Sequence, residues 1–194
     1  GGTVAVDHSY SWSSGSTSAT ATGLAAGTYT VTTSDDNSCF AVDTFNITQP
    51  ATAITISTTI DNHVSCFGLA DGQASVSGAG GTVALDYSYS WSSGNTSASA
   101  TGLAAGTYIV TLSDDNSCLD IDTINITQPS AAVSFASVAS VNISCFGLAD
   151  GQASVSGTGG TVAVDYSYSW SSGNTSASAT GLAAGTYIVT LSDD

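Results

Sequence analysis

A repeat with a constant spacing of 79 residues constrains this chain more than any other feature of its sequence. Trp12, Trp91 and Trp170 recur at that spacing, since 91 − 12 and 170 − 91 are both 79. Units joined head to tail provide reach, stiffness and multivalency, whereas an active site gains little from being multiplied. The repeat therefore favours an array-forming protein over an enzyme.

The repeats are nearly identical where they can be compared. Residues 65–115 and 144–194 differ only at positions 79/158 and 85/164. The sequence thus predicts three stretches, which are a partial repeat at 1–50, a complete repeat at 51–129 and a partial repeat at 130–194.

Each unit has the pattern of a β-protein. Tyr87, Tyr89 and Trp91 alternate with Ser88 and Ser90, which predicts a strand with aromatic residues on one face and hydroxyls on the other. Further strands are predicted over residues 53–60, 73–77, 96–101, 108–112 and 119–127, with turn residues between them. The predicted fold class is all-β, with tandem immunoglobulin-like β-sandwich repeats in an extended array.

One motif in each unit is typical of immunoglobulin-like sandwiches. The segment 103–108, Leu-Ala-Ala-Gly-Thr-Tyr, has the pattern of a tyrosine corner, in which a Tyr hydroxyl bonds back to the backbone upstream. The residues expected to be structural are its tyrosines and the three tryptophans of the aromatic strand, namely Tyr29, Tyr108, Tyr187, Trp12, Trp91 and Trp170. A sugar-binding role for these tryptophans is the alternative interpretation.

Charge and composition exclude several functions. The chain has no Lys or Arg and a net charge of −15, so it is expected to bind no nucleic acid and to insert into no membrane. Its only histidines are His8 and His63, and Tyr87 and Tyr166 stand where His8 does in the next two units. Because a general base cannot be optional among near-identical copies, we expect no catalytic residues and no enzyme activity.

One acidic cluster is a candidate metal site. Asp114, Asp115 and Asp120, with Asp122 nearby, lie at the junction between two predicted strands. Carboxylate-rich turns hold Ca²⁺ in many extracellular proteins, and a solvated turn is the alternative. Calcium is the one cofactor that the sequence suggests.

The four cysteines allow two pairings that repeat with the array. One joins Cys66 to Cys118 within a unit, and the other joins Cys39 to Cys66 and Cys118 to Cys145. The second is favoured, because a Cys before strand B and one after strand F lie at opposite ends of an immunoglobulin-like sandwich. It requires residues 119–127 and 132–143 to form a hairpin that turns at Gln128-Pro129.

Several short motifs together resemble the SprB repeat, a family found in large surface proteins of Bacteroidetes that include gliding-motility adhesins. They are Cys66-Phe67-Gly68, Asp71-Gly72, Gly80-Gly81, Tyr87–Trp91, Gly102–Tyr108 and Ile126–Pro129. The resemblance implies export by the type IX pathway, a location on the cell surface or in a filament, and no known catalytic activity.

The function expected on this basis is a non-catalytic structural repeat of an extracellular fibre or surface adhesin. The alternative is a module in which each repeat binds a carbohydrate or another surface ligand. The expected partners are other copies of the chain along or between fibres, and surface glycans. In addition, Asp122-Thr123-Ile124 resembles the O-glycosylation site of Bacteroidetes, with Thr44 in a looser version of the motif.

Overall fold

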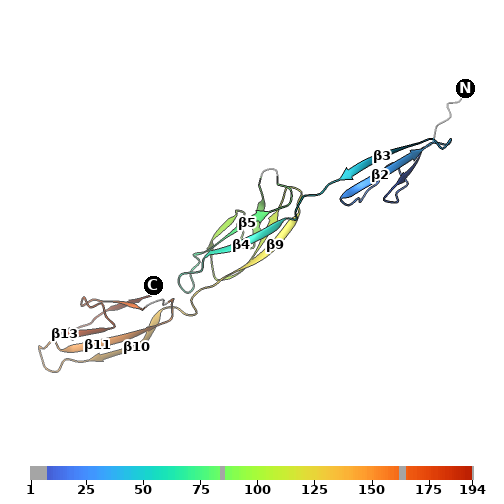
Figure 1. Ribbon diagram of the computed structural model, residues 1–194. Coiled ribbons are helices and arrows are strands. Elements are labelled where there is room, and N and C mark those ends of the chain that lie inside the picture. The colour runs from blue at the N-terminus through green and yellow to red at the C-terminus, as the bar shows by residue number, and fades with distance from the viewer. Residues whose placement is uncertain (1–7, 84–85, 162–164, 194) are drawn as a thin grey trace. The chain divides into compact units, whose positions relative to one another are not determined.

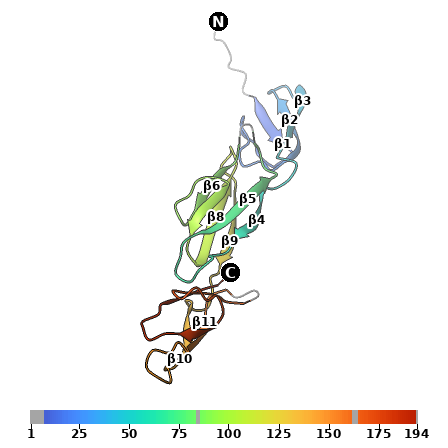
Figure 2. The same cartoon turned by 90° about the vertical axis from the view of Figure 1, so that its left-hand side faces the viewer.

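The structure is a computed structural model, and it describes residues 8–83, 86–161 and 165–193. The chain divides into two compact units, Gly1–Ala53 and Ile54–Asp194. All described elements are antiparallel strands in small sheets, and the described residues contain no helix (Figures 1 and 2). The predicted fold class, all-β with tandem sandwich repeats, is confirmed. The boundaries predicted at 50/51 and 129/130 stay predictions.

The second repeat is a sandwich of two three-stranded sheets. One sheet has the order β4-β5-β7 and the other has the order β6-β8-β9. These orders correspond to the A-B-E and C-F-G sheets of immunoglobulin-like domains. The strands are β4 (Thr55–Asn62), β5 (Gly72–Ala79), β6 (Ser88–Trp91), β7 (Ser99–Leu103), β8 (Gly106–Ser113) and β9 (Leu119–Ile126).

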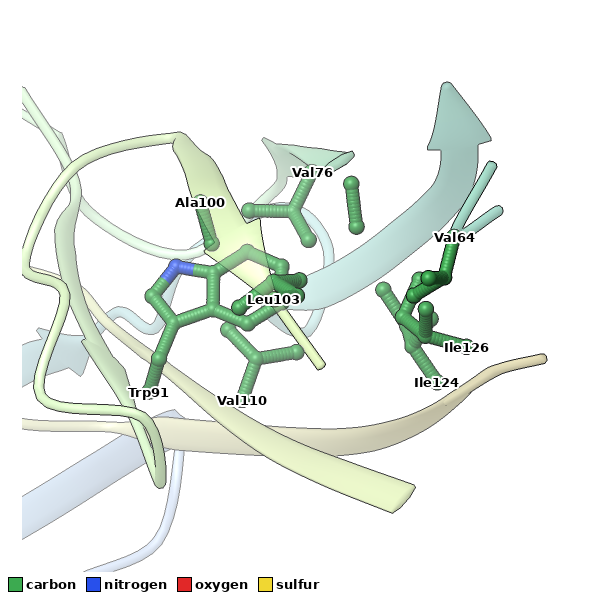
Figure 3. Close-up of a cluster of buried hydrophobic side chains, with 9 residues drawn as sticks. Val64, Val76, Trp91, Ala100, Leu103, Val110, Ile124 and Ile126 are labelled. Carbon is green, nitrogen blue, oxygen red and sulfur yellow. The ribbon is translucent and has the colours of Figure 1, made fainter. Parts of the chain in front are cut away.

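The core of this repeat lies between the two sheets. Alternate residues of each strand point inward, so the aromatic strand buries Trp91 and leaves Ser88 and Ser90 exposed. Figure 3 shows Trp91 beside Leu103 and Val110, and Ile124 and Ile126 beside Val64. The main cluster of buried hydrophobic residues is Val64, Ala74, Val76, Trp91, Ala100, Leu103, Val110, Ile124 and Ile126.

The first unit contains a single sheet with the order β1-β2-β3. Its strands are β1 (Ser9–Trp12), β2 (Gly27–Ser34) and β3 (Phe40–Ile47). The Trp12 and Phe45 rings are 5.7 Å apart between centroids, yet Phe45 is 43% exposed. Every residue of β3 is exposed, because no second sheet covers it within the described residues of this unit.

The third repeat has a three-stranded sheet, β10-β11-β13, and a two-stranded sheet, β12-β14. Its strands are β10 (Ser134–Val141), β11 (Gly151–Thr158), β12 (Ser167–Trp170), β13 (Ser178–Leu182) and β14 (Val189–Ser192). Its cluster of buried hydrophobic residues is Val155, Trp170, Ala179 and Leu182. Within the described part of this repeat, no strand takes the place that β9 has in the second repeat.

A search of the described residues for a membrane-spanning helix finds no segment that is long and apolar enough.

Candidate functional site

The Asp114 side chain organises the turn between β8 and β9. Its Oδ1 accepts hydrogen bonds from the backbone N–H groups of Asn116 at 3.0 Å and Cys118 at 2.8 Å. Its Oδ2 accepts one from the N–H of Thr82 at 2.9 Å, in the loop that follows β5. Only 7% of Asp114 is exposed. The carboxylate therefore joins two loops.

The equivalent aspartates of the first and third repeats make corresponding hydrogen bonds. Asp35 accepts from the N–H groups of Asn37 and Cys39 at 2.9 and 2.8 Å, and Asp193 accepts from the N–H of Thr161 at 2.7 Å. The turn contacts thus recur in the first repeat, and the contact to the loop after β11 recurs in the third.

Hydrogen bonding lowers the pKa of three aspartate side chains, Asp71, Asp114 and Asp150, from the ordinary value of 3.8. The N–H of Thr82 is the largest cause of the lowered pKa of Asp114, and the N–H groups of Cys118 and Asn116 add to it. The pKa of Asp71 and that of Asp150 are lowered chiefly by the hydroxyl groups of Ser65 and Ser144, respectively. All three carboxylates are thus stabilised in the charged form.

We expect the chain to lose stability in acid, and Asp114→Asn to reduce that loss. A carboxyl group with a lowered folded-state pKa contributes stability above its unfolded pKa of 3.8, and this contribution disappears as the pH falls through the folded-state pKa. Thermal melts from pH 7 to pH 2 should show a lower Tm for Asp114→Asn at pH 7 and a shallower decline below pH 4. Asp36→Asn, at an exposed turn position, is the control. Parallel curves for wild type and Asp114→Asn would contradict the assigned role of Asp114.

The two aspartates of β9 connect the edge strands of the two sheets. Asp120 Oδ2 accepts from the N–H of Ile56 at 2.8 Å, and Asp122 Oδ2 accepts from the Thr58 hydroxyl at 2.9 Å. These two bonds connect the edge strands β9 and β4, which belong to different sheets. Asp120 and Asp122 therefore bridge the two sheets, a role that the sequence analysis did not predict.

Two more hydrogen bonds at the far end of the same edge show that β4 and β9 run in the same direction. Val64 N–H donates to the Thr127 carbonyl at 2.9 Å, and Thr127 N–H donates to His63 Nδ1 at 3.1 Å. His63 thus has a structural contact in this repeat.

The proposed calcium ligands do not converge in this arrangement. Asp114 accepts hydrogen bonds within the turn, and Asp120 accepts one from β4 at the sheet edge. The N–H of Asp115 donates to the Thr82 carbonyl at 3.2 Å. Among the described residues, no group of three or more His, Cys, Asp or Glu side chains is placed to hold a metal ion. Calcium binding at Asp114, Asp115 and Asp120 stays a prediction.

The four cysteines are exposed and carry free thiols in this structure. Cys66 follows the end of β4 that lies beside Thr127, whereas Cys118 precedes the start of β9, beside Ile56. About eight residues of strand at ~3.3 Å each separate these positions by roughly 26 Å, and a disulfide needs Cα atoms within about 7 Å. This geometry opposes the Cys66–Cys118 pairing.

The hairpin expected for the other pairing is wrong. β9 pairs with β8 and lies beside β4, while β10 pairs with β11, so β9 and β10 are not partners. The reason is that Ile124 and Ile126 of β9 are buried in the core of their own repeat. The pairs Cys39–Cys66 and Cys118–Cys145 stay predictions without support from strand pairing.

The two threonines expected to carry glycan are on exposed strand positions. Thr44 and Thr123 both lie on edge strands, at equivalent places in β3 and β9. Thr123 lies on the exposed face of β9 with Leu119 and Ile121, and its N–H donates to Asp122 Oδ1 at 2.7 Å. Their modification stays a prediction.

The tyrosine motif has the same hydrogen bond in each of the three repeats. The Tyr108 hydroxyl donates to the Ala104 carbonyl at 3.0 Å, and the corresponding bonds of Tyr29 to Ala25 and Tyr187 to Ala183 measure 3.2 and 3.1 Å. Each bond ties the start of a β8-type segment to the turn before it.

The tryptophans lie inward. Trp91 and Trp170 are 3% and 6% exposed, and their indole N–H groups donate to the carbonyls of Ser97 and Ser176. Trp12 is partly buried and makes the same bond to Ser18. In the second and third repeats, these side chains therefore offer no open platform for a sugar.

Sequence reasoning missed an apolar group on the outer face of β8 and β9. Ile109, Leu119 and Ile121 are 49%, 59% and 58% exposed. The sequence signal is a change of phase, because apolar residues stand at positions 119 and 121 and then at 124 and 126. Since β9 pairs with β8 without a register shift, the phase change places apolar side chains on both faces.

The family model of the SprB repeat matches residues 57–96 and 137–175. The resemblance to this family is confirmed for both stretches, which lie in the second and third repeats. No curated protein matches the sequence.

One solved structure that is similar contains the three N-terminal domains of the highly immunogenic outer capsid protein (Hoc) of bacteriophage RB49. The sequence identity is 16% and the TM-score is 0.39. The match covers 84% of this chain and 64% of that chain, so this chain spans less than two thirds of its length.

Proposed function

We propose that this chain, which carries two SprB repeats, is a non-catalytic structural part of an extracellular fibre or surface adhesin. The observation that carries the proposal is the tandem array of near-identical sandwiches that matches a family of surface adhesin repeats. Its location is the bacterial cell surface, reached by type IX export. The chain extends from the surface as a series of repeated domains and has no enzyme activity.

Two features of the molecule support a structural role. The carboxylates that shape each sandwich bond to the chain's own backbone or hydroxyl groups, as Asp114 and Asp122 do. The surface carries net charge −15 without a single Lys or Arg, which keeps neighbouring repeats from collapsing onto one another.

A second candidate function follows from the outer face of β8 and β9. Ile109, Leu119 and Ile121 form an exposed apolar group next to polar strand residues. Such a group is typical of a contact surface, either for another fibre or for a surface ligand such as a glycan. A ligand-binding module in each repeat is therefore the alternative.

Calcium and O-linked glycan belong to the same proposal. Both would suit an acidic surface protein, with calcium at the Asp114 turn and glycan on Thr123 and Thr44. Disulfides between Cys39 and Cys66 and between Cys118 and Cys145 would suit the oxidising exterior.

The test of the proposed function is labelling of intact native cells with antibody raised against the repeats, followed by electron microscopy. We expect label on the outer surface and on fibres shed from it. Label that appears only after the cells are permeabilised would contradict the surface role.

Binding of the purified chain to cells or glycans separates the structural role from the ligand-binding role. If the repeats bind a ligand through the outer face, the doubly substituted chain Leu119→Ser/Ile121→Ser should lose binding to cells or glycans at least tenfold. If binding is unchanged, the outer face is not a ligand site. The matched control is Thr107→Ser, on the same sheet near its other end.

A further inference from the structure

The outer face of the sheet β6-β8-β9 carries no carboxylate at its outward strand positions, in a chain of net charge −15. β9 contributes Leu119, Ile121, Thr123 and Asn125 to this face, and the outward positions of β6 and β8 hold only Ser, Thr and Ile. Asp120 and Asp122 have the opposite phase and bond to β4. The second repeat therefore has one sheet face that is uncharged.

The apolar residues of this face are neighbours across the strands. Leu119 lies opposite Ser113, and Ile121 lies opposite Thr111. Ile109, two residues before Thr111 on β8, is the diagonal neighbour of Ile121. The three apolar side chains thus form one contiguous stripe, and rows of hydroxyl groups extend from it across the sheet.

The corresponding face of the first unit has the same character. Phe40 lies opposite Ser34 and Val42 opposite Thr32, and the two apolar side chains are 72% and 57% exposed. The outer face of a sheet points away from the sandwich interior, so this agreement does not depend on what covers the inner face. The uncharged face is thus a repeated feature of the chain.

The outer face of the other sheet, β4-β5-β7, is different. The outward positions of β5 include Gln73, Ser75 and Ser77, all of them polar. The Ser75 hydroxyl donates to Asp61 Oδ1 at 3.0 Å, so this face also carries a carboxylate. Only the β6-β8-β9 sheet of this repeat combines an exposed apolar stripe with neutrality on its outer face.

The absence of Lys and Arg limits how two copies of the chain can touch. No ion pair between copies can form with such side chains, and a contact that covers a carboxylate without a partner costs its desolvation. An uncharged face of one copy is therefore complementary to the same face of another. In the second repeat, the outward positions of β6, β8 and β9 hold no aromatic ring for a sugar to stack on, which favours a copy of the chain over a glycan.

The size of the face indicates that pairing needs more than one repeat. Three strands about 4.8 Å apart, with about eight residues at ~3.3 Å each, make a face of roughly 400 Å². A stable interface takes about 800 Å² from each partner. The faces of two repeats reach this area together, so a tandem array associates where a single face would not.

We propose that the outer faces of the β6-β8-β9 sheet and of its repeat equivalents pair with the same faces of a second copy of this chain. The contact is isologous, with Leu119 and Ile121 of one copy packed on the stripe of the other. It joins fibres side by side. Thr123 lies on this face, so the contact requires that Thr123 carry no glycan.

This contact rests on the proposed function and names the partner of the outer face. Its test uses only the purified 194-residue chain, whereas labelling of native cells tests the surface role. Failure of one is therefore distinguishable from failure of the other.

The first experiment is sedimentation of the unglycosylated chain over a range of concentrations at an ionic strength of about 0.15 M. The wild type should associate as concentration rises. Leu119→Asp/Ile121→Asp should weaken association at least about tenfold, because apolar burial is lost and like charges meet across the contact. The control Ser77→Asp/Thr101→Asp adds the same charge to the outer face of the other sheet and should associate like wild type. A wild type that stays monomeric, or equal weakening by the two double variants, would overturn the proposal.

Cross-linking locates the contact without relying on a loss of association. The four natural cysteines are exposed, so they can be replaced by Ser. Thr111→Cys in that background should be joined between copies by a short bifunctional maleimide, and Ser77→Cys should not. Equal yields at the two positions would overturn the assignment of the face.

Salt distinguishes this contact from one that is bridged by cations. Association should increase with ionic strength, because salt screens the repulsion between copies of charge −15. CaCl₂ and NaCl at matched ionic strength should have equal effects. Association that requires calcium would overturn an uncharged contact.

Discussion

Ile126→Ala should destabilise the second repeat by about 2–5 kcal/mol, because it removes a fully buried side chain and leaves a cavity in a small core. Ile126 is 1% exposed and lies against Val64 and Gly72. Calorimetry of the chain should show one component of the thermal transition shifted to lower temperature.

The same strand supplies the control. Ile121 is 58% exposed on the opposite face of β9, so Ile121→Ala should change stability by no more than about 0.5 kcal/mol. Equal losses for the two substitutions would show that β9 does not present its even-numbered residues to the core.

The second large effect is expected at Gly81, which combines a left-handed backbone with a close contact. Its φ is +68°, and a Cβ there would lie 2.6 Å from Asp114 Oδ2. Gly81→Ala therefore strains the backbone and also displaces the carboxylate that accepts from Thr82, Asn116 and Cys118. We expect the Tm of the second repeat to fall and the turn between β8 and β9 to loosen.

Gly94 separates the two causes. Its φ is +90°, but no atom lies within 4 Å of a Cβ built on it. Gly94→Ala should therefore show the cost of the backbone alone, about 1–2 kcal/mol. Gly81→Ala should lower the Tm by at least about 4 °C more. A Tm for Gly81→Ala as high as that of Gly94→Ala would mean that Asp114 is not essential to the turn.

Much of the local structure could be predicted from the sequence. Alternation placed Trp91 inward and Ser90 outward, and the Leu-Ala-Ala-Gly-Thr-Tyr motif predicted a turn that the Tyr108 hydroxyl bonds across. These features depend on residues close together in the chain, and strand and turn geometry determines the spacing of those residues directly.

The hydrogen-bond partners of the acidic residues could not be predicted from nearby sequence. Asp114, Asp120 and Asp122 are neighbours in sequence and suggested one metal site. Their partners are Thr82, Ile56 and Thr58, which are 32, 64 and 64 residues away. Only the packing of the two sheets reveals that one carboxylate shapes a turn and two bridge an edge.

Nearly identical sequences in different surroundings make the same point. Residues 99–103 and 178–182 form strands β7 and β13, whereas the related residues 20–24 form none. The difference is the partner, because β7 pairs with β5 and β13 with β11, and no β5-type strand is present among the described residues of the first unit.

The sequence by itself determined that the chain is a repeat of short alternating strands, and where its turns fall. Only the tertiary structure decided which of those strands are complete, which apolar faces are covered and what each aspartate bonds to. The physical reason is that a strand has no hydrogen-bonding partner within itself. Its extent and its buried face depend on neighbours that lie far away in the chain, such as β9 beside β4.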